Sequence, residues 1–327
     1  MHLVCETLDD ALRDLYPRLL EHTEIIVTSR GDTRESLGVL IEIEKPRARL
    51  SRTETRCKPF SCLGELLWYL TRDNKLDFIV RYIRDYENES EDGITVYGGY
   101  GARLFGQRHE NQIENVIRLL CVNPLSRRAV IQLFNAEDIS HRYKEIPCTT
   151  TMQFIIRHGR LNMLTNMRSN DAFIGLPHDI FCFTMIQEII ACSLGFQLGI
   201  YKHFVGSMHL YETCREEAEQ YLSEAVQPRI EMPPMPEGDP WSPIRRLLDA
   251  EHRIRSGEMI DAGRWGVGAY WADLIRLLQI FEATGDEERI NALKSEMAFK
   301  PYGPYIDSRK MMKPRKPQTP AQPSLKL

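Results

Sequence analysis

Residues 146–154, IPCTTTMQF, place one cysteine between a proline and a run of alternating threonine and apolar residues. A cysteine thiolate is an intrinsically strong nucleophile. Cys148, at the start of a predicted strand, is therefore a candidate for covalent catalysis. Free cysteine is also among the most buried residue types, so Cys148 taken alone is more simply a core residue.

Polar clusters lie on both sides of Cys148, in stretches where a plain core would have apolar residues. Taken alone, each has an ordinary structural explanation. Asp179 stands at the entrance of a very apolar helix, where aspartate is a common N-cap. The arginines suit a solvated face, and a single histidine such as His209 is more often structural. The clusters are SRR (126–128), NMRSND (166–171), GLPHD (175–179) and VGSMHLY (205–211).

The bulk composition is that of a globular protein with a sizeable core, since 43% of the 327 residues are hydrophobic and 27% are charged. A net charge of −4 and a pI near 6.2 argue against a dedicated nucleic-acid binder. The first residues carry acids where a signal peptide would carry basic and apolar residues. No apolar run reaches the roughly 20 residues that span a bilayer. We expect a soluble, cytoplasmic protein without membrane contact.

The eight cysteines show no disulfide framework and no CxxC pair. In a long chain without a secretion signal, such cysteines are most simply reduced thiols. We therefore expect neither disulfides nor a bound metal.

Apolar spacing predicts an α+β protein, with mostly helices and one strand up to residue 120 and more strands after it. His158 and Gly159 form a predicted hairpin turn, and the glycine- and tyrosine-rich residues 97–106 are expected to be a loop. Helices are predicted over 7–22, two segments within 62–86 broken near Asp73, 107–120, 180–193, 211–225, 243–254, 269–283 and 286–299, and strands over 37–43, 129–134, 151–157, 160–168 and 197–211.

Composition divides the chain into three parts. Residues 1–227 are expected to form a catalytic core. Residues 228–310 are expected to form a proline-rich connection and a helical extension, and the proline- and lysine-rich residues 311–327 a disordered tail.

The order and spacing of the motifs resemble those of thymidylate synthase. The pattern PC-x4-QF is followed by RS-x-D-x3-GLP and then HLY, and an ELLW helix (65–68) and the SRR pair precede them. The resemblance covers residues 25–225. It implies a three-layer α+β fold around a central mixed sheet, and an obligate homodimer joined sheet to sheet.

Departures from thymidylate synthase point to a particular branch of that family. This chain has Thr149, Met167 and Ser207 where the family has histidine, glutamine and aspartate, and Asp179 where it has asparagine. These changes resemble the deoxycytidylate hydroxymethylases of phages and the CMP hydroxymethylase of mildiomycin biosynthesis, an enzyme of nucleoside antibiotic formation.

Aspartate in place of asparagine favours cytosine over uracil. Uracil offers an acceptor at O4 and a donor at N3, which an amide pairs with at once. Cytosine reverses them, and a carboxylate accepts from N4 and shares a proton with N3. A site built for one pattern rejects the other because buried polar groups are left unpaired.

The resemblance also implies a mechanism and a role for each residue. Cys148 adds to C6 of the pyrimidine, methylenetetrahydrofolate donates one carbon to C5, and water adds to the exocyclic methylene. Arg168 is expected to lower the pKa of Cys148. Glu65 and Tyr100, or less well Tyr97, relay protons. The phosphate is bound by Arg30, Arg168, Ser169 and, across the dimer, Arg127 and Arg128; His209 and Tyr211 bind the sugar, and Asp171 contacts the folate.

Two further features bear on the reaction and the sugar. No tryptophan lies between residues 69 and 99, where thymidylate synthases usually carry one, and this gap is expected to admit water. Arginine outnumbers lysine 31 to 11, which suits a GC-rich cellular genome and favours CMP over dCMP. The alternatives are a thymidylate synthase-type methyltransferase on dUMP and a non-catalytic nucleotide-binding regulatory protein.

Overall fold

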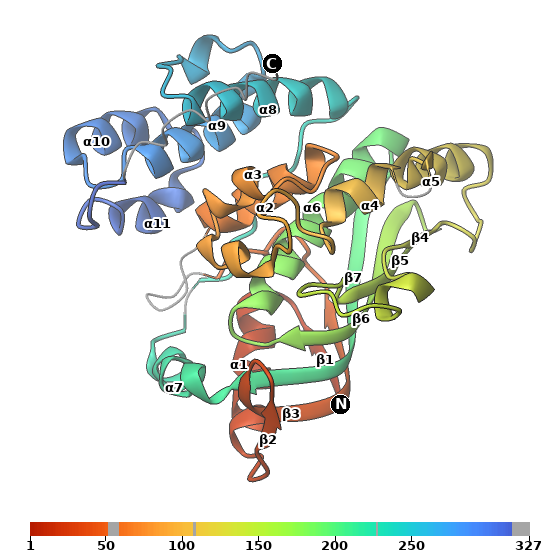
Figure 1. Cartoon of the computed structure of the whole chain (residues 1–327). Coiled ribbons are helices and arrows are strands. Elements are labelled where there is room, and N and C mark those ends of the chain that lie inside the picture. Colours follow the sequence, from red (N-terminus) through yellow and green to blue (C-terminus); the bar gives the residue numbers. More distant parts are fainter. Residues whose placement is uncertain (52–58, 107–108, 227, 316–327) are drawn as a thin grey trace, which may run out of the picture. The chain divides into compact units, whose positions relative to one another are not determined.

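The computed structural model describes residues 1–51, 59–106, 109–226 and 228–315 (Figure 1). The chain forms two compact units, residues 1–239 and 240–327. The first unit contains the sheet and the second is helical, so the predicted α+β class is confirmed.

A mixed sheet of seven strands, counted over the described residues, organises the first unit. Its order is β1-β3-β7-β6-β5-β4, and β2 pairs with the first three residues of β3. The pairs β1·β3 and β6·β7 are parallel and the others are antiparallel. The strands are β1 (His2–Cys5), β2 (Ile26–Thr28), β3 (Gly31–Ile43), β4 (Val130–Gln132), β5 (Thr149–Arg157), β6 (Arg160–Asp171) and β7 (Gln197–Tyr211).

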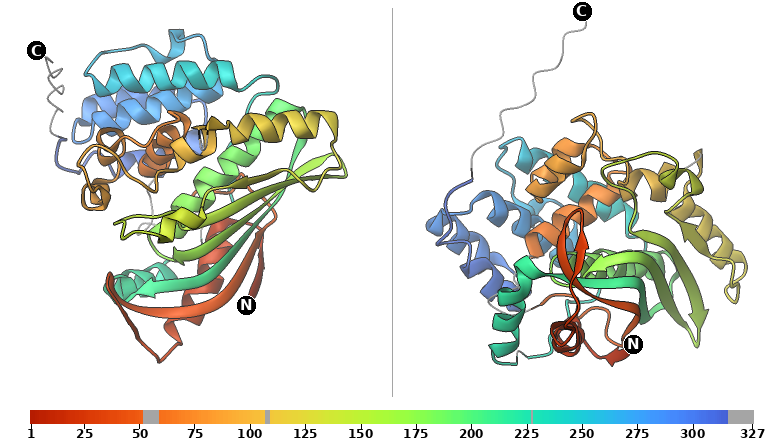
Figure 2. Two further views of the ribbon diagram at one scale, coloured as in Figure 1. Left: turned by 45° about the vertical axis from the view of Figure 1, so that its right-hand side comes forward. Right: turned by 60° about the horizontal axis from the view of Figure 1, so that its bottom comes forward.

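One face of the sheet is buried under helices. The long helix α6 packs on β6 and β7, and α2 and α5 pack on α6, so sheet and helices build the layers seen in Figure 2. Registered residues such as Phe154, Met163 and Tyr201 are fully buried on this face. The helices of this unit are α1 (Leu8–Leu20), α2 (Pro59–Leu70), α3 (Leu76–Val80), η1 (Arg84–Glu89), α4 (Tyr100–Gly106), α5 (Gln112–Val122), η3 (Ala136–Ile139), α6 (Gly175–Leu194), η4 (Glu212–Cys214) and α7 (Arg215–Ser223).

The opposite face of the sheet carries exposed apolar side chains. Val4 is 56% exposed, Val130 44% and Phe204 41%. Phe204 pairs in register with Leu40 on one side and Asn166 on the other, so it lies near the middle of this face.

The strands β6 and β7 both break their alternation beside the site. Buried and less buried residues alternate up to Met167 on β6 and up to Val205 on β7. The next buried residues, Asn170 and Met208, come three positions later instead of two. A Cβ at Gly206 would lie 2.9 Å from the carbonyl oxygen of Arg168, so the two backbones approach closely here. A one-residue slip turns the following side chains to the other face, and it brings Asn170 toward α6.

The expected loop at 97–106 is wrong for all but its first three residues, because Tyr100–Gly106 form α4. The glycines serve close packing rather than a turn. A Cβ at Gly101 would clash with the carbonyl oxygen of Asp73 and lie 2.9 Å from that of Tyr69. The hairpin at His158–Gly159 is confirmed, with both residues at positive φ.

The second unit contains α8 (Trp241–Arg255), η5 (Ala262–Arg264), α9 (Gly268–Glu282), α10 (Glu287–Glu296), η6 (Lys300–Tyr302) and α11 (Gly303–Asp307). The three predicted helices are confirmed, and α9 is buried along most of its length. Most of the predicted tail, residues 316–327, lies outside the described residues. Among the helices described in either unit, none is long and apolar enough to cross a bilayer.

Candidate active site

A pocket of about 360 Å³ opens beside the ends of β6 and β7, within the range of small-molecule sites. Ten of the predicted site residues line it together: Arg30, Glu65, Tyr100, Cys148, Arg168, Ser169, Asp171, Asp179, His209 and Tyr211. Arg127 and Arg128 do not line it; they are exposed residues just before β4.

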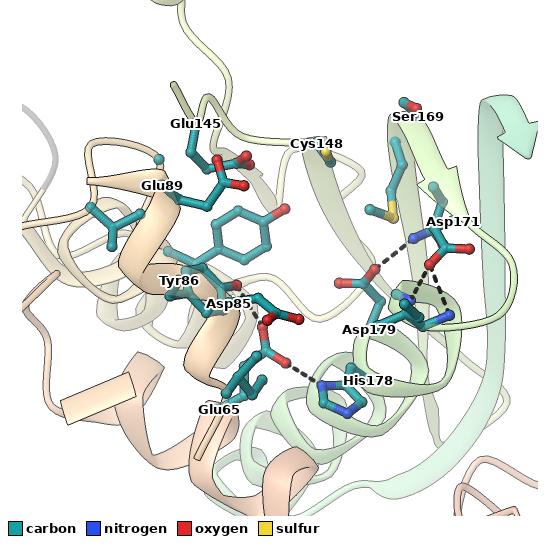
Figure 3. A pocket seen from close by; sticks show the side chains of 18 of the residues that line it. Glu65, Asp85, Tyr86, Glu89, Glu145, Cys148, Ser169, Asp171, His178 and Asp179 are labelled. Atoms are coloured by element: carbon teal, nitrogen blue, oxygen red, sulfur yellow. Dashed lines mark hydrogen bonds and ion pairs between the residues drawn. The ribbon is translucent and has the colours of Figure 1, made fainter. Parts of the chain in front are cut away.

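Cys148 stands immediately before β5 at the pocket wall (Figure 3). Arg168 holds the segment around it, because its guanidinium donates to the carbonyl oxygens of Ile146 and Pro147 at 3.1 Å each. The Nη2 of Arg168 lies 3.5 Å from the Cys148 sulfur. Cys148 is thus held by Arg168, the residue that the sequence predicted beside it.

The expectation that arginine lowers the pKa of Cys148 is wrong in its net direction. Burial raises the pKa of the thiol to about 12, and the nearby carboxylates of Glu145 and Asp179 add to this. Arg168 and Arg30 act in the expected direction but are outweighed. Cys148 is therefore a thiol rather than a thiolate.

Arg30 is engaged by two carboxylates at the pocket rim. Its Nη2 lies 2.8 Å from Glu89 Oε2 and 3.0 Å from Glu145 Oε2, and it also donates to the carbonyl oxygen of Lys144. Burial raises the pKa of Glu145 above its usual value, and the Glu89 charge adds to the rise against the attraction of Arg30. A phosphate bound by Arg30 has to compete with these two side chains.

Asp179 is fixed by a chain of buried polar groups. The Nδ2 of Asn170 donates to Asp179 Oδ2 at 2.8 Å, and Asn170 Oδ1 lies 3.0 Å from His203 Nε2. Burial lowers the pKa of His203 to about 3, so its ring is neutral and carries one proton. That proton is on Nε2, and the Tyr201 hydroxyl donates to Nδ1 over 2.7 Å. Asn170 and His203 thus each donate one hydrogen bond and accept another.

Asp179 does not cap α6, because that helix starts four residues earlier at Gly175. The N-cap residue is Ile174, and the side chain that accepts hydrogen bonds at this end of the helix is that of Asp171, from the backbone amides of Phe173, Ile174 and Gly175. Burial raises the pKa of Asp179 well above its usual value, and the Glu65 charge adds to the rise.

Glu65 lies on α2 at the floor of the pocket and is 6% exposed. The hydroxyls of Tyr69 and Tyr86 donate to its Oε1 at 2.9 and 3.1 Å, and His178 Nδ1 lies 2.8 Å from its Oε2. Burial alone raises the pKa of Glu65, but His178 and the two hydroxyls lower it below its usual value. Glu65 is therefore an ionised carboxylate facing the site.

Tyr100 and Tyr97 occupy different environments. The hydroxyl of Tyr100 donates to Thr149 Oγ1 and accepts from the Thr149 amide, both at 3.0 Å. Tyr97 instead donates to Asp138 and stacks on Tyr143, outside the pocket lining. Of the two tyrosines, the pocket wall contains Tyr100.

Ser169, His209 and Tyr211 lie together at the ends of β6 and β7. The Oγ of Ser169 is 3.4 Å from His209 Nδ1, and the rings of His209 and Tyr211 meet edge to face at 5.0 Å. These groups form one polar edge of the pocket.

Comparison with known protein families assigns the fold just described. Residues 41–237 match the family described as thymidylate synthase. The chain belongs to the thymidylate synthase family. This stretch includes Glu65, Cys148 and Asp179 with the strands and helices that position them.

Two similar members of the family come from phages. The chain is 33% identical to the deoxyuridylate hydroxymethyltransferase of Pseudomonas phage M6 over 162 residues, which are 49% of this chain and 46% of that protein. It is 27% identical to the deoxyuridylate hydroxymethyltransferase of Bacillus phage SP01 over 212 residues, or 61% and 55% of the two chains. The chain thus spans about half the length of the curated relatives it matches.

The pocket has the chemistry of a folate site, as expected of a thymidylate synthase family member. Trp68, Tyr86, Ile83 and Ile174 give the pocket aromatic and aliphatic walls of the kind that suits a flat pterin ring. Asp171 uses three of the about four lone-pair positions of a carboxylate on backbone amides. The position left over suits a ring N–H. Among the described residues, no group of three or more His, Cys, Asp or Glu is placed to hold a metal.

Several functional residues of the site were missed from the sequence. Asn170 and His178 stand within the quoted motifs NMRSND and GLPHD. Each is a polar residue directly beside a predicted site residue, and that position could have identified it. Glu145 and Glu89 at Arg30, and Tyr86 at Glu65, had no signal, because each partner is distant in the chain.

Proposed function

We propose that this chain is a pyrimidine nucleotide 5-hydroxymethylase that acts on cytidine 5′-monophosphate, with CMP preferred to dCMP. Membership of the thymidylate synthase family and the names of the two phage relatives support hydroxymethylation at C5. The observation that carries the choice of base is Asp179, a pocket carboxyl held by Asn170 rather than by a helix terminus.

Cytosine matches Asp179 in either protonation state, whereas uracil matches only one. A neutral carboxyl donates to N3 of cytosine and accepts from N4, and an ionised one accepts from N4 and from protonated N3. Uracil needs a donor for O4, which only the neutral form has. An ionised Asp179 facing O4 leaves both acceptors unpaired, at a cost of about 1–3 kcal/mol per group.

Covalent chemistry starts at Cys148. Its sulfur loses its proton and bonds to C6, the electrons of the C5–C6 double bond move toward N3, and N3 gains a proton through Asp179, so that the number of protons is unchanged. Methylenetetrahydrofolate, when bound, supplies one carbon at the oxidation level of formaldehyde to C5. Tyr100 and Glu65 lie on the pocket wall to relay the proton that C5 loses.

Hydration is assigned to Glu65. A water oxygen bonds to the exocyclic carbon and its proton passes to the Glu65 carboxylate. The C5–C6 double bond then forms again and Cys148 leaves as a thiolate, which yields the 5-hydroxymethyl nucleotide.

The nucleotide phosphate is assigned to Arg30, Arg168 and Ser169, with Arg127 and Arg128 from a second copy. Arginine forks suit a phosphate dianion. Support for a homodimer comes from the exposed apolar face around Phe204 and from the position of Arg127 and Arg128 outside their own chain's pocket. His209 and Tyr211 are assigned to the sugar, and the preference for CMP rests on composition alone.

The test is an assay of methylenetetrahydrofolate with CMP, dCMP, UMP and dUMP, with products identified by mass. Hydroxymethylated cytidylate, abolished in Cys148→Ser, is the expected result. Hydroxymethylated dUMP as the product would instead mean that the substrate is deoxyuridylate, as named for the phage relatives. Methylated dUMP would support a thymidylate synthase reaction, and binding without tritium release from 5-tritiated nucleotides would support a regulatory protein.

A further inference from the structure

His178 is a buried histidine that the proposed mechanism leaves without a role. It lies on α6 directly before Asp179 and is 8% exposed. Its ring is next to Glu65 at the pocket floor (Figure 3). Nδ1 is 2.8 Å from Glu65 Oε2 and Nε2 is 3.1 Å from Ser61 Oγ. Because both ring nitrogens have polar partners, the imidazole is held in one orientation.

The hydrogen bonds of Glu65 are divided between its two oxygens. Tyr69 and Tyr86 donate to Oε1, and His178 is placed at Oε2. A buried carboxylate costs several kcal/mol unless it is paired. Three donors on two oxygens fix the plane of this carboxylate and satisfy its charge.

His178 is the basic group among the ionisable residues that face Glu65. The others are Tyr69 from α2, Tyr86 from η1, and Asp179 and Cys182 from α6, while Cys62 from α2 faces His178 itself. Burial lowers the pKa of His178, but Cys62 and the Glu65 carboxylate raise it, and the net direction is upward. The pair is thus a carboxylate beside an imidazolium.

We propose that His178 is a positioning residue that orients the Glu65 carboxylate and keeps it ionised, so that Glu65 accepts a proton from water. The inference rests on the proposed function in giving Glu65 that task. The contact between His178 and Glu65 itself does not depend on the substrate.

The first test compares pH profiles of kcat/KM. His178→Asn keeps an N–H donor for Glu65 and removes the charge, and His178→Phe removes both. The fall of kcat/KM at low pH is set by protonation of Glu65 and forms the acid limb of the profile. Loss of the positive charge of His178 raises the pKa of Glu65, so this limb moves to higher pH by about one unit or more. His178→Phe also lowers the plateau by about tenfold or more. His158→Asn, at an exposed hairpin position with φ of 52°, is the matched control and leaves the profile unchanged.

An acid limb unmoved in both His178 variants would overturn the inference. The second measurement needs no turnover: ¹⁵N NMR of histidine-labelled protein reports both ring nitrogens. We expect His178 to be doubly protonated at neutral pH, and its titration to move to lower pH in Glu65→Gln. A neutral His178 at that pH refutes the inference even if the enzyme is active, and the expected spectrum supports it even if the proposed reaction fails.

Discussion

Replacing Asp179 by asparagine is expected to exchange the base preference from cytosine to uracil. Asn170 donates to the Oδ2 position of residue 179, so an amide there must place its oxygen toward Asn170. Its NH₂ group then occupies the position of Oδ1 and faces the pocket. That arrangement pairs with O4 and N3 of uracil and opposes N4 and N3 of cytosine.

The size of the effect follows from two mismatched groups. At about 1–3 kcal/mol for each unpaired buried group, the ratio of kcat/KM for cytosine to that for uracil changes by about 2–6 kcal/mol. This is about 30-fold to 10⁴-fold. The assay is competition between CMP and UMP, and between dCMP and dUMP, with products separated by mass.

Asn170→Ala in the Asp179→Asn background is the matched test of the orientation. Without the Asn170 donor the new amide can rotate, so the uracil preference should shrink toward equality. An Asp179→Asn enzyme that keeps its cytosine preference would refute the role of Asp179 in base recognition. An undiminished uracil preference in the double variant would refute only the role of Asn170.

Four further predictions follow from the site and the sheet. The ratio of uracil to cytosine turnover should fall as pH rises through the raised pKa of Asp179, because only the neutral acid donates to O4; a flat ratio across the accessible pH range contradicts this. Glu145→Gln should lower the pKa of Cys148 and speed its alkylation by iodoacetamide at fixed pH, and an unchanged rate would be evidence against the Glu145 contribution. Gly101→Ala should lower the free energy of unfolding in urea by about 1–3 kcal/mol through overpacking, and full stability would mean that the helices can separate. Phe204→Glu should convert a dimer to monomer in analytical ultracentrifugation, with no shift expected if this face is not the interface.

Patterns within one segment predicted much of the fold. Strict alternation on either side of His158–Gly159 predicted β5 and β6 together with their turn, and the apolar run predicted α6. The prediction failed at α4, because glycines needed for close approach to the carbonyl oxygens of Asp73 and Tyr69 resemble those of a turn.

The parts of the site that depend on distant partners were harder to predict. His178 and Glu65 are separated by 113 positions in the chain, so no local pattern reveals their pairing. The pKa of Cys148 was predicted from its nearest cations, whereas burial and Glu145 set its net direction. Asp179 and Asp171 were both predicted as site residues, but only the start of α6 shows which of them caps the helix.

Asp171, the last residue of β6, accepts hydrogen bonds from three backbone amides at the start of α6. These bonds join the end of β6 to the helix that bears Asp179. One contiguous segment, residues 168–179, therefore contains Arg168, Asn170, His178 and Asp179. Cys148 lies outside this segment, directly before β5. Under the proposed function, changes at residues 170–179 alter which base is accepted, whereas Arg168 in the same segment holds the chain around Cys148. If Asp179 selects the base as proposed, a few substitutions within one short segment are enough to change the pyrimidine that the enzyme accepts.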